Sequence, residues 1–578
     1  MKPCRIILRL LPLAFAAGVA QAQPTITQPT ITQPGGAAFE RRELERRDTI
    51  PRAQPRPAPA TPALAEPPAD AQRFRLNAVL IEGNQALPTT ALEPAWRDLI
   101  GRDVTLLEME QLTATLSAQY REAGFVLSQV ILPAQRVEGG VVRLQAVEGF
   151  LANLDATGGT AHQQAITRRL LEPAVAERPL RITTLERGLL LSRDLLGPGV
   201  ESVLRPSSGT FGAADLTAQI TPRPFDGYVT IDNRNSRLLG PWSLRAGGTA
   251  RGFLGGAERI DVNIAATPNF RDLLFGQAAI TLPITGVAPW FDGSSVQLSA
   301  DHTNARPVLR RSGVTVLNTI QSETNIRLGL TVPVIRSRPE NLYARFSMNW
   351  RESTANTRFF GFDLGDATDR LLVAEGRLTW DVADRFDGLT LVDAAFRQGL
   401  AANGLSQIGV RGPGAARADF FLAQLFISRV QRFGETPWSV AVEGLFQYSP
   451  DPLPVSERFS LGGDRMGRGF GPGNTTGDSG YAGRLELRHT RRLPVREPFL
   501  GTAQFYGFGD WGAAIDRFRV RDGRPFEQLA SVGAGARIDV TQWLTITPEV
   551  ATQVAGRPSD TRRRERETRF LIGATARF

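Results

Sequence analysis

The chain has 578 residues, of which 42% are hydrophobic, so it is long enough to bury a sizeable core and to hold several domains. Its formal net charge is +9, but the arginines are scattered along the chain, which argues against nucleic acid as a partner. The only cysteine, Cys4, lies in a segment that we expect to be removed, so a disulfide framework is excluded for the mature chain.

Residues 1–22 have the three parts of a secretory signal peptide. Lys2 and Arg5 form the basic part, residues 10–19 form the apolar part, and residues 20–22 fit the cleavage site. No later segment approaches the ~18 uninterrupted apolar residues of a membrane-spanning helix. The remaining classes are therefore a periplasmic protein, a secreted protein or a β-barrel.

Residues 23–72 read as a tail that carries one short helix. The helix candidate spans about residues 37–47, and a Pro-rich run over residues 51–68 follows it as a semi-stiff linker. A helix on such a linker predicts a detachable plug. The residues of this plug are Phe39, Glu43, Leu44 and Arg47. The alternative is a charged, solvated segment that docks nowhere.

Residues 73–149 alternate between strand and helix patterns. We expect a strand over residues 74–83, helices over 89–100 and 106–123, and strands over 125–132 and 141–147. This β-α-α-β-β order indicates a small α+β domain.

The same pattern returns in residues 150–222. Here we expect a strand over 151–156, helices over 162–171 and 184–195, and strands over 200–206 and 214–220. Two tandem copies indicate an interaction array whose sheet edges could bind an extended partner strand, although plain spacers remain the alternative. The edge residues expected to bind substrate are Val126, Ser128, Val130, Val141 and Arg143.

From residue 223 to residue 578 the dominant signal is strand-like alternation of apolar and polar residues. A soluble sandwich would share this period, so the number of segments matters more. Sixteen segments begin near residues 225, 241, 258, 272, 294, 323, 341, 369, 388, 417, 438, 479, 501, 529, 543 and 569. An even number of strands of roughly ten residues predicts an antiparallel outer-membrane β-barrel, closed by pairing of its last strand with its first.

A Gly-rich loop interrupts this alternation at about residues 451–478, and a strand with one acidic residue follows it. The loop motif consists of Gly467, Arg468, Gly469 and Phe470, and the strand motif of Phe508, Asp510 and Gly512. Phe508 and Asp510 share one strand face, so the carboxylate would point into the barrel lumen. An arginine fork is the best geometric partner for a partly dry carboxylate, so we expect Arg468 to fold back and meet Asp510.

These features together resemble the outer-membrane transporter of two-partner secretion, a member of the Omp85 superfamily whose tandem units are called POTRA domains. The residues that carry the resemblance are 120–135 with 147–149, the loop motif and the strand motif. The family's loop motif is Val-Arg-Gly-Tyr/Phe, and here Gly467 replaces the Val.

The resemblance implies a pore that recognises an unfolded exoprotein through periplasmic POTRA domains and secretes it through the barrel without ATP. It further implies that the loop between the eleventh and twelfth strands enters the barrel and is needed for secretion. We expect outer-membrane lipid around the barrel, a monomer, and neither a cofactor nor nucleic acid. An Omp85-type assembly factor or a passive porin is the alternative, and the two POTRA units with their plug helix favour secretion.

Enzymatic interpretations are weaker. Ser479 lies in a Gly-Asp-Ser-Gly segment, but His162, its faint partner, belongs to another domain, so a catalytic triad is not expected. His162, His302 and His489 lie far apart and lack the spacing of a zinc site. The Gly-rich loop is not followed by Gly-Lys-Ser/Thr and is not a phosphate loop. We therefore expect no catalytic and no metal-binding residue.

Overall fold

The computed structural model describes residues 53–54, 73–311, 314–409, 414–493, 501–518, 526–556 and 566–578. The expected signal peptide (1–22) and plug helix (37–47, with Phe39, Glu43, Leu44 and Arg47) lie outside the described residues. Among the described residues, no helix is both long and apolar enough to cross a membrane.

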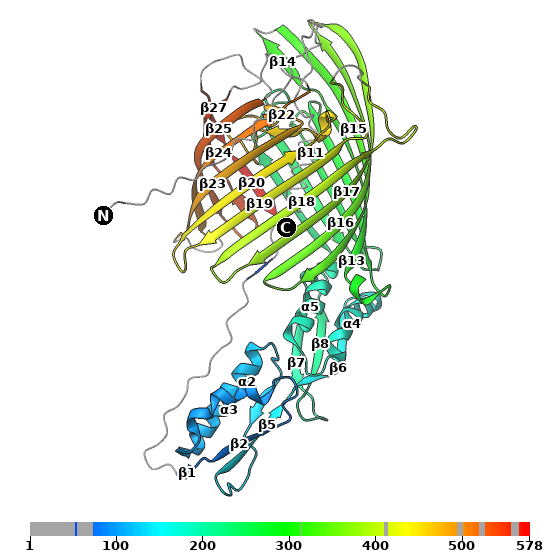
Figure 1. The fold of residues 1–578 in the computed structure, drawn as a ribbon. Helices are drawn as coiled ribbons and strands as arrows, with labels where there is room; N and C mark the ends of the chain where they lie inside the picture. The colour runs from blue at the N-terminus through cyan, green and yellow to red at the C-terminus, as the bar shows by residue number, and fades with distance from the viewer. Residues whose placement is uncertain are drawn as a thin grey trace, which may run out of the picture. The chain divides into compact units, whose positions relative to one another are not determined.

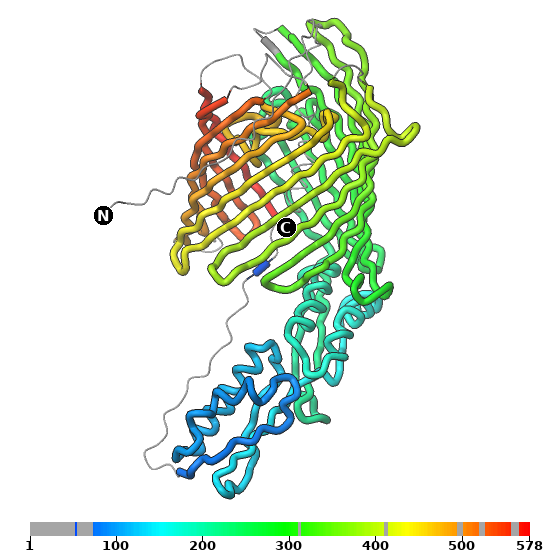
Figure 2. Tube along the Cα trace, in the orientation of Figure 1, coloured from blue at the N-terminus to red at the C-terminus, as the bar shows by residue number. Residues whose placement is uncertain are grey.

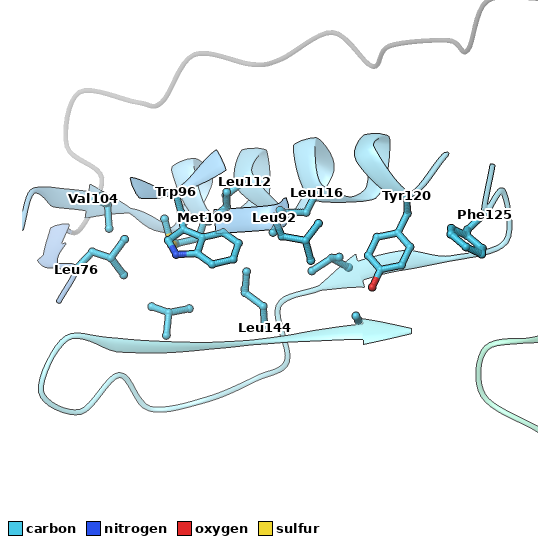
Figure 3. Packing of buried hydrophobic residues seen from close by; sticks show 13 residues of the cluster. Leu76, Leu92, Trp96, Val104, Met109, Leu112, Leu116, Tyr120, Phe125 and Leu144 are labelled. Atoms are coloured by element: carbon cyan, nitrogen blue, oxygen red, sulfur yellow. The ribbon is translucent and has the colours of Figure 1, made fainter. Parts of the chain in front are cut away.

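The first α+β domain has a three-stranded sheet in the order β2-β5-β4, with β2 and β5 parallel. Its elements are β1 (Arg73–Arg75), β2 (Ala78–Glu82), α2 (Thr89–Leu92), η1 (Glu93–Ala95), η2 (Arg97–Leu99), β3 (Asp103–Thr105), α3 (Leu106–Glu122), β4 (Gln129–Ile131) and β5 (Val141–Val147). Helix α3 begins at a capping box, in which Thr105 and Glu108 each bond the other's backbone. Its apolar face lies over the sheet and buries Met109, Leu116 and Tyr120 completely (Figure 3).

Two expected elements of this domain are shorter than predicted. The helix expected over residues 89–100 ends at Leu92 and continues as two 3-10 turns, because Pro94 lacks the amide hydrogen that an α-helix would bond at this position. The strand expected over residues 125–132 is limited to β4, since the residues before Gln129 form turns.

The second α+β domain repeats the arrangement with the sheet order β6-β8-β7. Its elements are β6 (Phe150–Gly158), α4 (Ala161–Ala176), α5 (Ile182–Leu196), β7 (Val200–Pro206) and β8 (Ala213–Ile220). Helices α4 and α5 pack closely at Gly188, where an added Cβ would lie 2.6 Å from the carbonyl oxygen of Leu170.

Most of the remaining strands form one closed antiparallel barrel, which confirms the predicted fold (Figure 1). They are β9 (Phe225–Asp232), β10 (Ser243–Arg251), β11 (Arg259–Ala266), β12 (Leu273–Ile284), β13 (Ser294–Ala305), β14 (Val308–Arg311), β15 (Val314–Arg336), β16 (Glu340–Phe359), β17 (Phe362–Ala383), β18 (Gly388–Leu400), β19 (Phe421–Arg432), β20 (Trp438–Tyr448), β23 (Ser479–Arg492), β24 (Thr502–Ile515), β25 (Phe526–Asp539), β26 (Leu544–Ile546), β27 (Glu549–Ala555), β28 (Thr568–Leu571) and β29 (Gly573–Arg577). A short 3-10 turn, η3 (Pro289–Phe291), precedes β13. In the described part of the chain, three pairs of these segments each act as one strand: β13 with β14, β26 with β27, and β28 with β29. The barrel therefore has sixteen strands.

The last strand pairs with the first, from Gly573 opposite Asp232 to Arg577 opposite Tyr228. The outer face of the barrel is apolar: Val262, Ile264 and Leu328 are 45%, 49% and 55% exposed. Strands β15 to β17 have 20 to 23 residues and extend beyond their neighbours at one end of the barrel (Figure 1).

Candidate functional site inside the barrel

The connection between β20 and β23 (residues 449–478) forms a compact unit inside the barrel, which we call the lumen loop (Figure 2). It contains a 3-10 turn, η4 (Val455–Glu457), and a two-stranded sheet of β21 (Phe459–Leu461) and β22 (Thr475–Gly477). Its apolar side chains share one buried cluster with inward-facing residues of the barrel wall. The cluster consists of Phe459, Leu461, Met466, Phe470, Leu391, Phe426, Leu445, Ala482, Ala514 and Leu529.

Residues 462–471, the tip of the lumen loop, form a tight turn. The amides of Gly462, Gly463 and Phe470 donate to carbonyl groups within the tip, at 2.8 to 3.0 Å. Gly467, which replaces the Val of the family motif, has a φ of +87°. A β-branched residue would be strained in this left-handed conformation, and its Cβ would lie 2.6 Å from a methyl carbon of Leu529.

The guanidinium group of Arg468 lies between two buried glutamates. Its Nη2 donates to Oε2 of Glu486 on β23, and its Nη1 donates to Oε2 of Glu549 on β27, both at 2.8 Å. Its Cζ also stacks 4.2 Å from the ring centre of Phe508. Arg468 is only 5% exposed, so this charge is almost fully removed from water and depends on its partners.

Asp510 on β24 does meet Arg468, but through the backbone. The amide of Arg468 donates to Oδ2 of Asp510 at 3.1 Å, and the amide and hydroxyl of Ser531 on β25 donate to Oδ1. The expected ion pair between the Arg468 fork and the Asp510 carboxylate is therefore wrong. The short side chain of Asp510 accepts three hydrogen bonds, from the amide of Arg468 and from the amide and hydroxyl of Ser531. The longer side chains of Glu486 and Glu549 reach the guanidinium group.

Steric contacts explain why the motif positions 469 and 512 are glycines. An added Cβ at Gly469 would lie 2.8 Å from Cβ of Ser531, and one at Gly512 would lie 2.8 Å from Cβ of Ala482 and 3.0 Å from Leu461. Gly469 lets the tip reach the barrel wall, and Gly512 lets β21 lie against the wall.

Sequence reasoning missed the wall residues that hold the tip. Gly469 donates to Oγ of Ser531 and accepts from Nε2 of Gln553, both at 3.0 Å, and the carbonyl group of Phe470 accepts from Arg569. The missed residues are Arg234, Arg484, Glu486, Ser531, Glu549, Gln553 and Arg569. Alternation places such residues on the inner face, but it does not indicate which of the many inward polar residues meet the loop.

The expected substrate-binding residues of the first α+β domain need correction. Val141 and Arg143 lie on β5, which is the central strand, so both of its backbone edges are paired. Val126 and Ser128 precede β4, and the Ser128 hydroxyl accepts from the Gly149 amide at 3.1 Å inside the domain. Val130 does lie on edge strand β4, but the Ser117 hydroxyl of α3 accepts from its amide at 2.8 Å.

Ser479, the residue of the protease-like segment, fastens the base of the lumen loop. Its hydroxyl accepts from the amide of Ser449 at 3.1 Å. His162 lies near the start of α4 in the second α+β domain. Across the described ranges, no group of three or more His, Cys, Asp and Glu side chains is arranged to hold a metal ion.

Two family profiles match the chain. The profile "POTRA domain, ShlB-type" matches residues 74–149, and the profile "Haemolysin secretion/activation protein ShlB/FhaC/HecB" matches residues 215–538, which is more than half of the chain. Among curated proteins, the chain is 24% identical to heme/hemopexin transporter protein HuxB of Haemophilus influenzae (strain 86-028NP), over 81% of this chain and 82% of HuxB. It is also 24% identical to hemolysin transporter protein ShlB of Serratia marcescens, over 73% of each.

Solved structures show the same fold. CdiB from Escherichia coli superposes with a TM-score of 0.68 at 17% identity, covering 96% of this chain and 100% of CdiB. BamA from Haemophilus ducreyi lacking POTRA domains 1–3 superposes with a TM-score of 0.53 at 13% identity, covering 88% of this chain and 100% of BamA.

Proposed function

Because the chain belongs to the haemolysin secretion/activation protein family, whose members are outer-membrane transporters with periplasmic POTRA domains, we propose that it recognises an unfolded exoprotein in the periplasm and secretes it through the barrel without ATP. The observation that carries this proposal is the tip of the lumen loop, held in the bore by Arg468 between Glu486 and Glu549. A loop that occupies the bore must move or be guided when a chain passes.

The POTRA domains offer edge strands for an extended cargo chain. Strand β7 is an edge of its sheet, and Val203 and Leu204 on it are 46% and 39% exposed. An unfolded segment that pairs with this edge would gain backbone hydrogen bonds whatever its sequence. Edge strands β2, β6 and β7 therefore replace Val141 and Arg143 as the proposed cargo contacts.

Contacts of the N-terminal tail with the barrel support the proposal that its helix acts as a plug. Of the Pro-rich linker, Ala53 and Gln54 are described: the Ala53 amide donates to Oδ2 of Asp381 at 2.5 Å, and the Gln54 amide donates to the carbonyl group of Arg338 at 2.7 Å. These contacts bring Ala53 and Gln54 to the barrel. The segment 37–47 would occupy the lumen at rest and leave it for secretion, and its deletion should raise pore conductance in planar bilayers.

Directionality needs no nucleotide, because the cargo can fold once it is outside, and the folded state cannot slide back through the bore. The relatives are named for different cargoes, hemolysin and heme/hemopexin among them, so the family match does not fix the cargo of this chain.

The test is co-expression with a candidate exoprotein from the same genome, comparing the wild type with Arg468→Ala. The variant should insert as a heat-modifiable barrel but export little cargo, because the tip loses its charged anchor. Arg385→Ala is a matched control, since Arg385 lies in the turn between β17 and β18, outside the bore contacts described above. Wild-type export by Arg468→Ala would contradict the proposed role of the loop.

A further inference from the structure

The lumen loop is also fixed at its other end, by a buried charge cluster that the tip does not use. Glu457 lies in residues 449–458, which we call the root of the lumen loop, and is 4% exposed. It accepts from Nη1 of Arg351 on β16 at 2.6 Å and from Nη1 of Arg397 on β18 at 3.1 Å. One carboxylate therefore ties the root to two strands of the wall.

The two wall arginines have carboxylate partners of their own. Nε of Arg351 lies 3.5 Å from Oε1 of Glu323 on β15, and Nε of Arg397 donates to Oε2 of Glu375 on β17 at 2.5 Å. Release of Glu457 would therefore leave Arg397 hydrogen-bonded to Glu375, and Arg351 within 3.5 Å of Glu323. This lowers the cost of opening the contact, since an unpaired buried charge is the main penalty when an ion pair breaks.

An apolar contact accompanies the charged one. Leu453 of the root is fully buried in a cluster with Leu371, Val373, Phe420 and Leu422, which come from β17, β19 and the residue before β19. Directly after Glu457, Arg458 turns the other way and bonds Asp516 and the carbonyl group of Thr476. The root thus contacts β16 and β18 on the Glu457 side. On the Arg458 side it contacts its own loop at Thr476 and the barrel at Asp516, directly after β24.

The tip and the root bind different parts of the barrel. The tip is held by β23, β24, β25, β27 and β28, the twelfth to sixteenth strands, and by Arg234 in the connection after β9. Glu457 is held by β16 and β18, the seventh and ninth strands. The lumen loop therefore crosses the bore and is fastened at both sides. A chain passes only if one fastening opens.

We propose that Glu457 is the releasable latch: the root swings away from β16 and β18 about Arg458, while the tip stays in place as a fixed support. This inference rests on the proposed function and adds the way in which the loop clears the bore. The tip is the less suitable moving part, because it is bound through backbone groups of Arg468 and Gly469 as well as through a side chain. The root reaches β16 and β18 through the Glu457 carboxylate, whereas its backbone contacts with the wall go to β20 and to Arg417, close to where the loop starts.

Glu457→Gln is the variant that tests the latch. An amide keeps the shape of the side chain, but it carries no charge, and its NH₂ group would face the donors of one arginine. Asp393→Asn is the matched control, because Asp393 is also 4% exposed and bonds Arg377 and Thr379 on the neighbouring strand of the wall.

The readout is the labelling rate of two single cysteines with a membrane-impermeant maleimide on whole cells. Leu453→Cys reports on the root and Met466→Cys reports on the tip; the native residues are 0% and 2% exposed. Cys4 lies in the expected signal peptide, so the mature full-length chain gives no background. Heat-modifiable migration verifies that each variant has inserted.

In the Glu457→Gln background, root labelling should rise several-fold while tip labelling stays at the wild-type rate, and Asp393→Asn should change neither. An equal rise at root and tip, or no rise at the root, would overturn the latch. Export is measured in the same strains to separate the two proposals. If root labelling rises while neither Glu457→Gln nor Arg468→Ala alters export, the latch stands and the proposed secretion role of the loop fails.

Discussion

At the scale of single residues, the contacts of Arg468 depend on the planar shape of its guanidinium group. The planar guanidinium donates to Glu486 and Glu549 at once through two different nitrogens while its face lies against Phe508. A lysine ammonium is a compact point charge without such a flat face. Positive charge alone is therefore not enough to hold the tip.

Arg468→Lys should export clearly less cargo than the wild type and more than Arg468→Ala. The ammonium group can satisfy one glutamate, but it cannot span both and also stack on Phe508. Quantitative immunoblotting of secreted cargo, normalised to the amount of inserted barrel, checks this order. Equal export by the lysine variant and the wild type would show that charge suffices.

A second residue-scale prediction concerns Tyr120 in the first POTRA domain. Its ring is fully buried among the core side chains (Figure 3). Its hydroxyl donates to Oε1 of Glu148 at 3.0 Å. Burial, and then the hydrogen bond to Glu148, raise the pKa of Tyr120 well above its ordinary value of 10.0. Because the unfolded chain ionises first, the stability that Tyr120 contributes is present below pH 10 and is lost as the pH rises above it.

Tyr120→Phe should therefore cost about 1 kcal/mol of domain stability at neutral pH, through the lost hydrogen bond. Glu148 keeps the bond from the Ala86 amide, at 2.6 Å, so the cost stays moderate. Above pH 10 the difference between variant and wild type should shrink or change sign. Hydrogen exchange of α3 amides in the full-length chain, measured on both sides of pH 10, checks this; a pH-independent difference would contradict it.

At the scale of elements, the lumen loop behaves as a small folded unit whose contact with the wall requires glycine. At Gly469, an added Cβ would approach Ser531 and backbone atoms of Thr552 and Gln553 within 2.8 to 3.2 Å. At Gly471, two residues further on, nothing lies within 4 Å of an added Cβ. The two positions therefore form a matched pair.

Gly469→Ala should displace the tip from the wall and reduce export, because β25 and β27 belong to the barrel sheet and cannot yield easily. Gly471→Ala should export like the wild type. Secretion assays on the two variants, with Met466→Cys labelling as a reporter of tip position, check the pair. Equal effects of the two substitutions would show that contact at Gly469 does not limit the loop.

At the scale of the whole molecule, the barrel presents an apolar outer face and a charged inner face, which is the distribution required by lipid outside and a polar bore inside. Leu328 in the middle of β15 points outward and is 55% exposed, whereas its neighbour Arg327 points inward and donates to Asn349. Val314 lies at the far end of the same long strand, where β15 extends beyond its neighbours (Figure 1).

Leu328→Arg should destabilise the inserted barrel by about 2 kcal/mol or more, because it places a charge in the hydrocarbon layer. Val314→Arg should be nearly neutral, because we expect that end of β15, where it pairs with β14, to lie outside the lipid. The folded fraction of each variant, measured by heat-modifiable migration after urea titration in lipid vesicles, checks the contrast. A neutral Leu328→Arg would place this face away from lipid.

The sequence alone determined the barrel and its strand number, because alternation with a period of two is a local property that each strand carries in its own residues. It also indicated the two α+β units and the two motifs, although Pro94 broke one expected helix and β5 proved to be a central strand. Only the tertiary structure decided that Glu486 and Glu549, and not Asp510, hold the guanidinium of Arg468. Such pairings join residues 18 to 81 positions apart, and they depend on strand register and loop path, which no local pattern records.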